Sequence, residues 1–558
     1  TMEEADTAVE VPETGARDIF QTIMYVLAGT VVIRVINYHY VKLSPSVMTA
    51  LSAVICGSVL MMLASLSPEI SGSLDAMRVM LKSFPEIVMD YMLGFLLFAA
   101  AIEVDLGRLG RVRSTVVTLA LGGTILSTLF VGTLTWLLLR RMLPLPFEIC
   151  LLFGTVVSPT DPVAVTSVLN EKPELISTST RYFVWCESLF NDAVGVVLYY
   201  GVLDFVTRQD ATLSEKLLGV ATVFFRECVV GVLVGLIMGY LAFQLIAAVD
   251  EPVLEITITI VLVGLLEVLC LHIEASIPLA CICAGLLIGN YGVHFGFSED
   301  GKEGFHQMWK FIDESLNSML FLLIGLLTVY WRPSLLGWGK YLLLMIAIIC
   351  ISLFSRAMSI IISLYSIVQV EKLLGINLRH TNIRYRAGTV GVLTWGGLRG
   401  GLTIALALGV IRNTAPMNTG PGNIIFLMTY TIVLWSLVGQ GLLFERACYM
   451  IQDASYFYKN SGFSGLAGAI VAEEEPEAPV SGFSDFSEST SLLNDKNGLY
   501  TDEGSKKLDR HERYSSMAGL ESLKPLPRLG DVFNKVHQSI FRTVDIPEVH
   551  EDEEEKRN

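Results

Sequence analysis

The chain has 558 residues, of which 52% are hydrophobic and only 17% are charged, and its mean hydropathy is +0.56. A soluble chain carries about 25% charged residues, so this composition excludes a wholly soluble enzyme and a chain that is disordered throughout. More than half of the formal net charge of −16 falls in the last sixth of the sequence, and no basic patch indicates a nucleic-acid partner.

Thirteen segments are apolar over roughly the 20 residues that a helix needs to cross a bilayer. In chain order they are 18–37, 46–68, 84–102, 114–139, 146–169, 179–206, 216–248, 253–272, 276–291, 305–331, 340–368, 384–411 and 423–448. The connections between them are short, which predicts an all-α polytopic membrane protein folded as one bundle.

Two connections are the most basic, and such a bias sets the orientation of a membrane protein. They follow the third and eleventh segments and contain Arg108, Arg111 and Arg113, and Lys372, Arg379, Arg384 and Arg386. Placing both in the cytoplasm predicts an extracellular or luminal N-terminal segment, residues 1–17, and a cytoplasmic C-terminus.

Residues 450–558 are predicted to form a cytoplasmic regulatory tail, because the apolar pattern ends there and 461–530 has a composition typical of disorder. Apolar residues between 531 and 544 recur on one helical face, which predicts a short amphipathic helix that docks on the transporter, a partner or the membrane surface. Another pattern matches an acidic dileucine sorting signal of eukaryotic cells: Glu488, Leu492 and Leu493. Chance remains an open explanation for both patterns.

The fifth segment is interrupted by Ser158-Pro159-Thr160-Asp161-Pro162. Proline removes a backbone donor and clashes with the preceding turn, so a helix cannot run through both prolines intact. The freed carbonyls and the Asp161 carboxylate would lie at membrane depth, where irregular backbone is tolerated only around protein or a water-filled cavity. Such oxygens suit a hard cation, while a structural kink capped by Asp161 is the alternative.

The sixth segment holds a polar cluster, since Glu187, Ser188, Asn191 and Asp192 recur four residues apart and share one helical face. An apolar run follows Asp192, and loss of hydration favours the neutral form of a carboxylate, whereas a nearby cation favours the charged form. Asp192 is therefore predicted to exchange a proton for a metal ion, the minimum chemistry of an antiporter. A polar seam that only holds helices together is the alternative.

Two arginines lie in other apolar segments. Arg356 in the eleventh segment needs a buried carboxylate partner, for which Glu187 is the candidate. Arg399 lies within Gly396-Gly397-Leu398-Arg399-Gly400-Gly401, whose glycines predict a second interrupted helix in the twelfth segment. Two interrupted segments in corresponding positions indicate two inverted repeats, with the site where two discontinuous helices cross.

The motifs at 158–162, 187–192 and 396–400 resemble those of the monovalent cation/proton antiporters, in the branch of the sodium/proton exchangers and the NhaP antiporters. The resemblance covers about 20–450 and implies a thirteen-helix homodimer whose core domain moves against a dimerisation domain, as in an elevator. It implies an antiporter domain at 18–449, with core helices at about 114–206 and 340–448 and dimerisation helices at about 18–102 and 216–331.

The resemblance also implies residue roles. The residues that it places at the ion and proton site are Asp192, Asp161, Thr160, Ser188 and Asn191. Glu187 with Arg356 would form a structural ion pair, and Arg399 would belong to the second crossover. Asn191 stands where electrogenic relatives have a second aspartate, which implies one cation per proton. The family often has Thr in place of Ser158 and Ala in place of Gly401, and neither departure removes a ligand.

The sequence thus predicts an electroneutral sodium/proton antiporter for pH regulation, a secondary active transporter that is not an enzyme and needs no cofactor. A potassium/proton antiporter is the open alternative, because K⁺ and Li⁺ also suit oxygen ligands. A cation channel would pass current, and an intramembrane aspartyl protease would carry Gly-x-Gly-Asp, which is absent around Asp161 and Asp192. The expected partners are a second copy, membrane lipid, and cytosolic regulators or sorting adaptors, in the plasma or endosomal membrane of a eukaryotic cell.

Overall fold

The regular structure of the protein is helical. The structure, a computed structural model, describes residues 16–460 except 42–44, 65–86, 143–144, 164, 167–168, 170–174, 177, 209–211, 331–337, 375–386 and 414–420. Within these residues every regular element is a helix, and seven helices are long and apolar enough to cross a membrane, with shorter apolar helices beside them. The all-α polytopic fold predicted from the sequence is confirmed.

The helices follow the predicted segments along the chain. The first half contains α1 (Ala16–Ile36), α2 (Pro45–Ala64), α5 (Leu93–Ile102), α6 (Leu106–Val117), α7 (Thr124–Leu139), α8 (Phe147–Val157) and α10 (Thr178–Thr207). The second half contains α11 (Leu213–Ala247), α12 (Pro252–Ile273), α13 (Ile277–Leu287), α14 (Val293–Phe295), α15 (Glu299–Leu326), α16 (Trp338–Leu374), α17 (Ala387–Trp395), α18 (Gly401–Asn413), α19 (Pro421–Leu434) and α20 (Gly441–Asn460). Wider or tighter helical turns adjoin several of them: η1 (Asn37–Val41), η2 (Ile87–Met92), η3 (Thr118–Gly123), η5 (Ile288–Gly292), η6 (Leu327–Tyr330) and η9 (Trp435–Gln440).

Several boundaries differ from the prediction. The helix α15 begins at Glu299 rather than at 305, because the Ser298 hydroxyl accepts a backbone N–H at 3.2 Å and caps the helix. The basic residues expected in the connection after the third segment lie on α6, since Asp105 accepts a backbone N–H at 2.7 Å and starts that helix. The helix α20 continues to Asn460, so the predicted start of the tail at 450 falls inside a helix.

The two closely spaced segments at 253–272 and 276–291 are separate helices. The chain reverses at Glu274, whose φ of 51° is left-handed, and Ala275 N–H donates to Cys270 O at 2.9 Å to close the end of α12. Ser276 then caps α13, in which Pro278 occupies the first turn.

Small residues bring α11 and α13 into backbone contact. Glycines at four-residue spacing on α11 meet small residues of α13: Gly231 with Ser276, Gly235 with Ala280 and Gly239 with Ala284. A Cβ built on Gly239 would lie 3.0 Å from Ala284 Cα, so a larger side chain would push the helices apart. On its other side α13 packs against α5, which fixes it between two neighbours.

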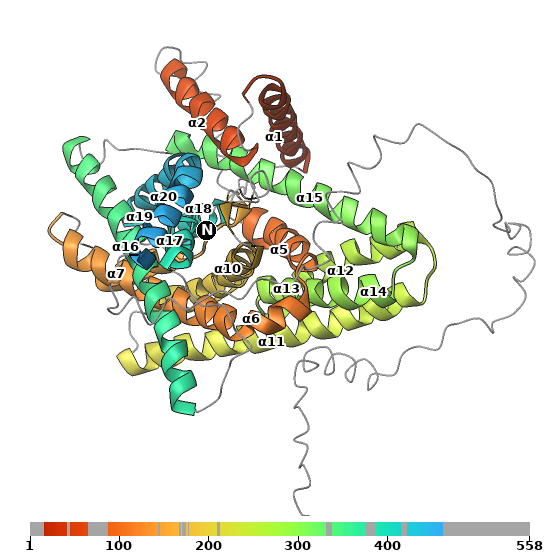
Figure 1. Cartoon of the computed structure of the whole chain (residues 1–558). Helices are drawn as coiled ribbons and strands as arrows, with labels where there is room; N and C mark the ends of the chain where they lie inside the picture. Colours follow the sequence, from red (N-terminus) through yellow and green to blue (C-terminus); the bar gives the residue numbers. More distant parts are fainter. Residues whose placement is uncertain are drawn as a thin grey trace, which may run out of the picture.

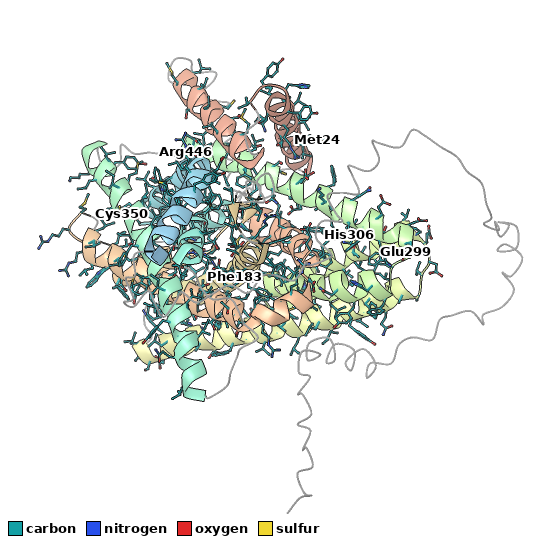
Figure 2. All side chains as sticks on the ribbon, viewed as in Figure 1. Met24, Phe183, Glu299, His306, Cys350 and Arg446 are labelled. Atoms are coloured by element: carbon teal, nitrogen blue, oxygen red, sulfur yellow. The ribbon has the colours of Figure 1, made fainter. Side chains whose placement is uncertain are left out.

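The helices form two groups around α10 (Figure 1). The helices α12 to α14 lie together on one side and α7 and α16 to α20 gather on the other, while α11 runs along the lower edge of the view past both. The helix α10 packs against α8, α11 and α18. A smaller cluster of buried apolar residues joins α5, α11, α12, α13 and α15, separate from a larger one. Phe183 of α10 is buried inside the bundle, while Glu299 and His306 lie toward the outer end of α15 (Figure 2). The predicted division into core and dimerisation helices remains a prediction.

Candidate functional site

Two interrupted helices cross in the interior. The helix α8 ends at Val157 and 158–162 is not helical, while α17 ends at Trp395 and α18 begins only at Gly401. The two extended stretches are joined directly, because Asp161 N–H donates to Leu398 O at 2.8 Å. The proline-containing and glycine-containing motifs therefore interrupt their helices and meet at one point. We call residues 158–162 the first crossing segment, residues 396–400 the second crossing segment, and the two together the crossing.

Charged groups compensate the helix ends that the crossing exposes. The Arg399 guanidinium donates to Ser158 O at 3.3 Å and Pro159 O at 3.1 Å, carbonyls left unpaired where α8 stops. The Asp161 carboxylate accepts Val163 N–H at 2.8 Å and lies against Gly400, at the positive N-terminus of α18. The positive charge of Arg399 thus lies at the C-terminal end of α8, and the negative charge of Asp161 lies at the N-terminal end of α18.

The Asn191 side chain connects α10 and the start of α7 to the first crossing segment. Its amide donates to Thr160 Oγ1 at 2.9 Å and Ser158 O at 3.4 Å, and its carbonyl accepts the Thr124 hydroxyl. Thr160 Oγ1 also lies 3.2 Å from Ser188 Oγ, and all these groups are buried. The atoms of Asn191 are therefore directed to protein groups that hold 158–160 in shape, and its place at the ion remains a prediction.

Glu187 and Arg356 form a bidentate ion pair between α10 and α16. The guanidinium donates to Glu187 Oε1 at 2.9 Å and to Oε2 at 2.7 Å, and the exposed fractions are 1% for Glu187 and 4% for Arg356. Planar, two-point pairing of this kind is the strongest form of charge-assisted hydrogen bond. The candidate partner of Arg356 inferred from the sequence is its partner in the structure.

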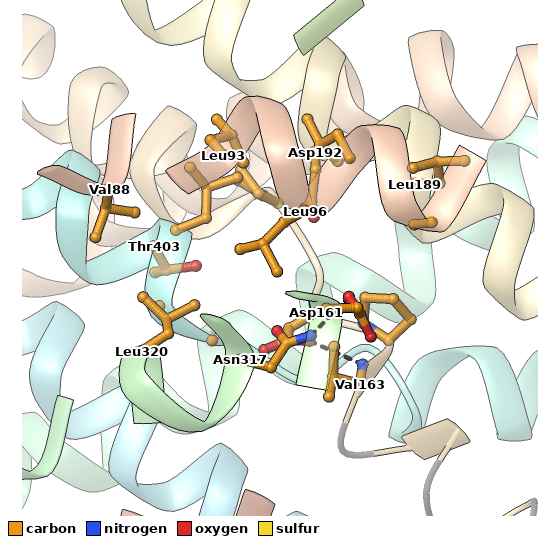
Figure 3. A pocket seen from close by; sticks show the side chains of 18 of the residues that line it. Val88, Leu93, Leu96, Asp161, Val163, Leu189, Asp192, Asn317, Leu320 and Thr403 are labelled. Carbon is orange, nitrogen blue, oxygen red and sulfur yellow. Dashed lines mark hydrogen bonds between the residues drawn. The ribbon is translucent and has the colours of Figure 1, made fainter. Parts of the chain in front are cut away.

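The two predicted site aspartates face one cavity of about 80 Å³ (Figure 3). Asp161 comes from the first crossing segment and Asp192 from α10, and the backbone N–H of Thr160 faces the Asp192 carboxylate. The rest of the wall is mainly apolar: Val88, Leu93, Leu96, Leu97, Ala100, Pro159, Pro162, Val163, Trp185, Leu189, Leu320, Gly400, Gly401 and Leu402, with the polar Thr403. Two carboxylates and a backbone amide are thus held together in a cavity whose wall is otherwise mainly apolar.

The structure adds residues that sequence reasoning missed. Asp313 and Asn317 of α15 line the same cavity, and Asn317 donates to Asp313 Oδ1 at 2.9 Å. Their spacing of four residues within a predicted apolar segment was the available signal. The sorting residues Glu488, Leu492 and Leu493 lie outside the described residues.

The donor set has a definite chemical preference. Carboxylates and hydroxyls offer hard oxygen atoms, and the buried hydroxyls of Thr160 and Ser188 lie beside the crossing. Hard oxygen ligands suit unpolarisable cations, and a carboxylate that can also take a proton lets the two species compete for one place. The arrangement is therefore suited to exchange of a cation for a proton.

Comparison with known proteins agrees with this reading. A family model described as "Sodium/hydrogen exchanger, transmembrane" matches residues 24–448. The chain is 31% identical over 423 residues to the Na(+)/H(+) antiporter NhaP of Pseudomonas aeruginosa, covering 75% of this chain and 93% of the relative. It is 30% identical over 364 residues to the Na(+)/H(+) antiporter NhaH of Halobacillus aidingensis, covering 64% of this chain and 81% of the relative.

The fold has a solved counterpart. The sodium proton antiporter MjNhaP1 of Methanocaldococcus jannaschii superimposes with a TM-score of 0.60, over 78% of this chain and 99% of that chain. Its sequence identity of 17% supports the fold alone. Together with the family model and the bacterial relatives, the helical crossing shows that the chain is a multi-pass integral membrane protein that belongs to the sodium/hydrogen exchanger family.

Proposed function

We propose that the protein exchanges one Na⁺ for one proton across its membrane, with Asp192 as the group that binds either species. Asp161, the backbone of Thr160 and the hydroxyl of Ser188 complete the cation site. The relatives NhaP and NhaH are named as Na(+)/H(+) antiporters, which supports sodium as the cation.

The formal charge of the crossing supports a ratio of one Na⁺ to one proton. The crossing and its ion pair contain three carboxylates and two guanidiniums, which leave a formal charge of −1: Asp161, Asp192, Glu187, Arg356 and Arg399. Because Asn191 is neutral, one Na⁺ or one proton brings this charge to zero. A net charge in a low-dielectric interior is unfavourable, so the filled states are the ones suited to cross the membrane.

The movement is proposed to be elevator-like. All residues of the crossing and of the ion pair lie between α8 and α10 or between α16 and α18. They can move as one unit, since the hydrogen bonds between the two crossing segments are internal to that unit. The helices α1, α2, α5 and α11 to α15, which fall within 18–102 and 216–331, would form the static part, and a second copy would associate through them. The proposed location is a eukaryotic plasma or endosomal membrane, with residues 461–558 in the cytoplasm.

Exchange by the purified full chain in proteoliposomes tests the proposal. A pH dye inside the vesicles should report alkalinisation or acidification driven by Na⁺ or Li⁺ gradients, at a rate independent of a voltage imposed with valinomycin. Asp192→Ala should abolish the signal while the protein still elutes as a monodisperse species. A rate that follows the voltage would refute the one-to-one ratio, and a response to K⁺ alone would replace sodium by potassium.

A further inference from the structure

One wall of the ion cavity belongs to α15, which lies outside the crossing. Asp313 and Asn317 project from this helix into the cavity that Asp161 and Asp192 also line. Asn317 is 8% exposed, and in Figure 3 it faces the same opening as Asp161. The cavity is therefore bounded by carboxylates on both sides, one side on the predicted moving unit and the other on the predicted static helices.

The electrostatic surroundings of Asp313 are mainly negative. The charge of Asp161 acts on it across the cavity, and Glu314 adjoins it on the same helix. Glu103, directly after the end of α5, also interacts electrostatically with Asp313, and Lys310, one turn away on α15, acts on Glu103 with the opposite sign. Like charges in such proximity are unfavourable, and either a bound proton or a cation between them relieves the repulsion.

Asn317 gives this carboxylate a fixed orientation. Its amide donates to Asp313 Oδ1 at 2.9 Å, and a hydrogen bond to a ligating carboxylate is the usual way in which a protein orients it. The other oxygen of Asp313 is then left to approach an ion.

We propose that Asp313, oriented by Asn317, is an additional ligand for the transported monovalent cation on the α15 side of the cavity. This assignment rests on the proposed sodium/proton exchange. It means that α15 holds the cation while the cation moves to or from its site at Asp161 and Asp192. Because Asp313 lies outside the crossing, its contact is made in one orientation of the site and lost in the other. Removing it should weaken capture of the ion and leave the exchange step itself intact.

The neighbouring residue Glu314 provides a matched control. It carries the same charge on the same turn of α15 but does not line the cavity, and it pairs with Arg34 of α1 at 2.8 Å. That pair is exposed, and exposed ion pairs contribute little to stability. Glu314→Gln thus removes one negative charge near the cavity without removing a group from it.

The experiment measures the Na⁺ dependence of exchange by the full chain in proteoliposomes, together with Na⁺-dependent thermal stabilisation of the detergent-solubilised protein. In Asp313→Asn the half-saturating Na⁺ concentration should rise about tenfold in both assays, as for loss of one supporting ligand, with little change in the maximal rate. Asp313→Glu should recover most of the affinity, and Glu314→Gln should match the wild type. Asn317→Ala should raise the same concentration by a smaller factor, which provides a second variant if Asp313→Asn folds poorly.

Three outcomes overturn the inference. Equal Na⁺ dependence in wild type and Asp313→Asn would show that the carboxylate is not a ligand, and equal shifts in Asp313→Asn and Glu314→Gln would indicate a general charge effect. Disappearance of the shift in high choline chloride would mean long-range attraction without direct contact, because salt screens only the former strongly. Failure of the proposed function looks different, since the wild type itself would then show no Na⁺-driven proton flux.

Discussion

The Asp161 carboxylate lies directly against the backbone of Gly400, at the point where the two crossing segments meet. A Cβ built on Gly400 would overlap Asp161 Oδ2, so the carboxylate occupies the space that any side chain at this position would need. Gly401, the next residue, is in the same situation toward Leu320 of α15. Here glycine is required for close approach, which explains why the second crossing segment is so rich in this residue.

Gly400→Ala should therefore slow exchange by about a hundredfold, because displacing Asp161 by an ångström is enough to spoil a binding geometry. The rate in proteoliposomes and the Na⁺-dependent thermal stabilisation should both fall. Gly264→Ala on α12 is the control, since a Cβ there would meet nothing within 4 Å. Normal exchange by Gly400→Ala would mean that Asp161 is free to move and that its position is not critical.

The ion pair of Glu187 and Arg356 should be structural. Either Glu187→Gln or Arg356→Ala leaves one buried charge without its partner, a loss of about 3–5 kcal/mol in stability. The double variant Glu187→Gln with Arg356→Ala should recover part of that loss, which thermal unfolding in detergent would measure. Double-variant losses equal to the sum of the single losses would show that the two residues are not energetically coupled.

Asn191 should matter through the shape of the first crossing segment. Asn191→Ala removes the donors to Thr160 and Ser158 and should cost about 1–3 kcal/mol in stability, with a strong loss of exchange. Thr124→Val removes one hydrogen bond to Asn191 and should cost about 1 kcal/mol, with a smaller loss of exchange. A larger effect of Thr124→Val than of Asn191→Ala, measured by thermal unfolding and exchange rate, would contradict this role.

The tail should be separable from transport. A chain that ends after Asn460 retains α20 and every residue of the crossing, so it should fold and exchange ions with an altered rate or pH dependence. Within the full chain, Leu492→Ala with Leu493→Ala should raise the fraction at the cell surface, measured by surface biotinylation. Leu520→Ala with Leu523→Ala is the matched control in the same tail. Complete loss of exchange in the purified shortened chain would make the tail part of the transport unit.

Much of this arrangement is predictable because the signals are local. A bilayer imposes a length on apolar segments, and prolines or clustered glycines mark where a membrane helix must break. The pairing of Glu187 with Arg356 is also predictable, since a buried arginine needs a carboxylate and Glu187 lies on the polar face of the sixth segment.

Other features depend on tertiary contacts that a local pattern does not contain. Asp313 and Asn317 have the spacing of an ordinary hydrated helix face, and only packing of α15 turns that face toward the cavity. The motif groups Asn191 with the ion-binding residues, but its carbonyl accepts a hydroxyl from Thr124, 67 residues earlier in the chain. The sequence shows that these groups are polar, but it does not show their orientation.

The glycine contact between α11 and α13 has a consequence for measuring motion. Helices slide past one another by changing the rotamers of interlocked side chains, and here almost no side-chain atoms lie between the two backbones. Their separation should therefore stay constant through the transport cycle. A pair of spin labels on these two helices would give an internal ruler of fixed length, and distances from either one to α10 or α18 would then report displacement of the site in absolute terms.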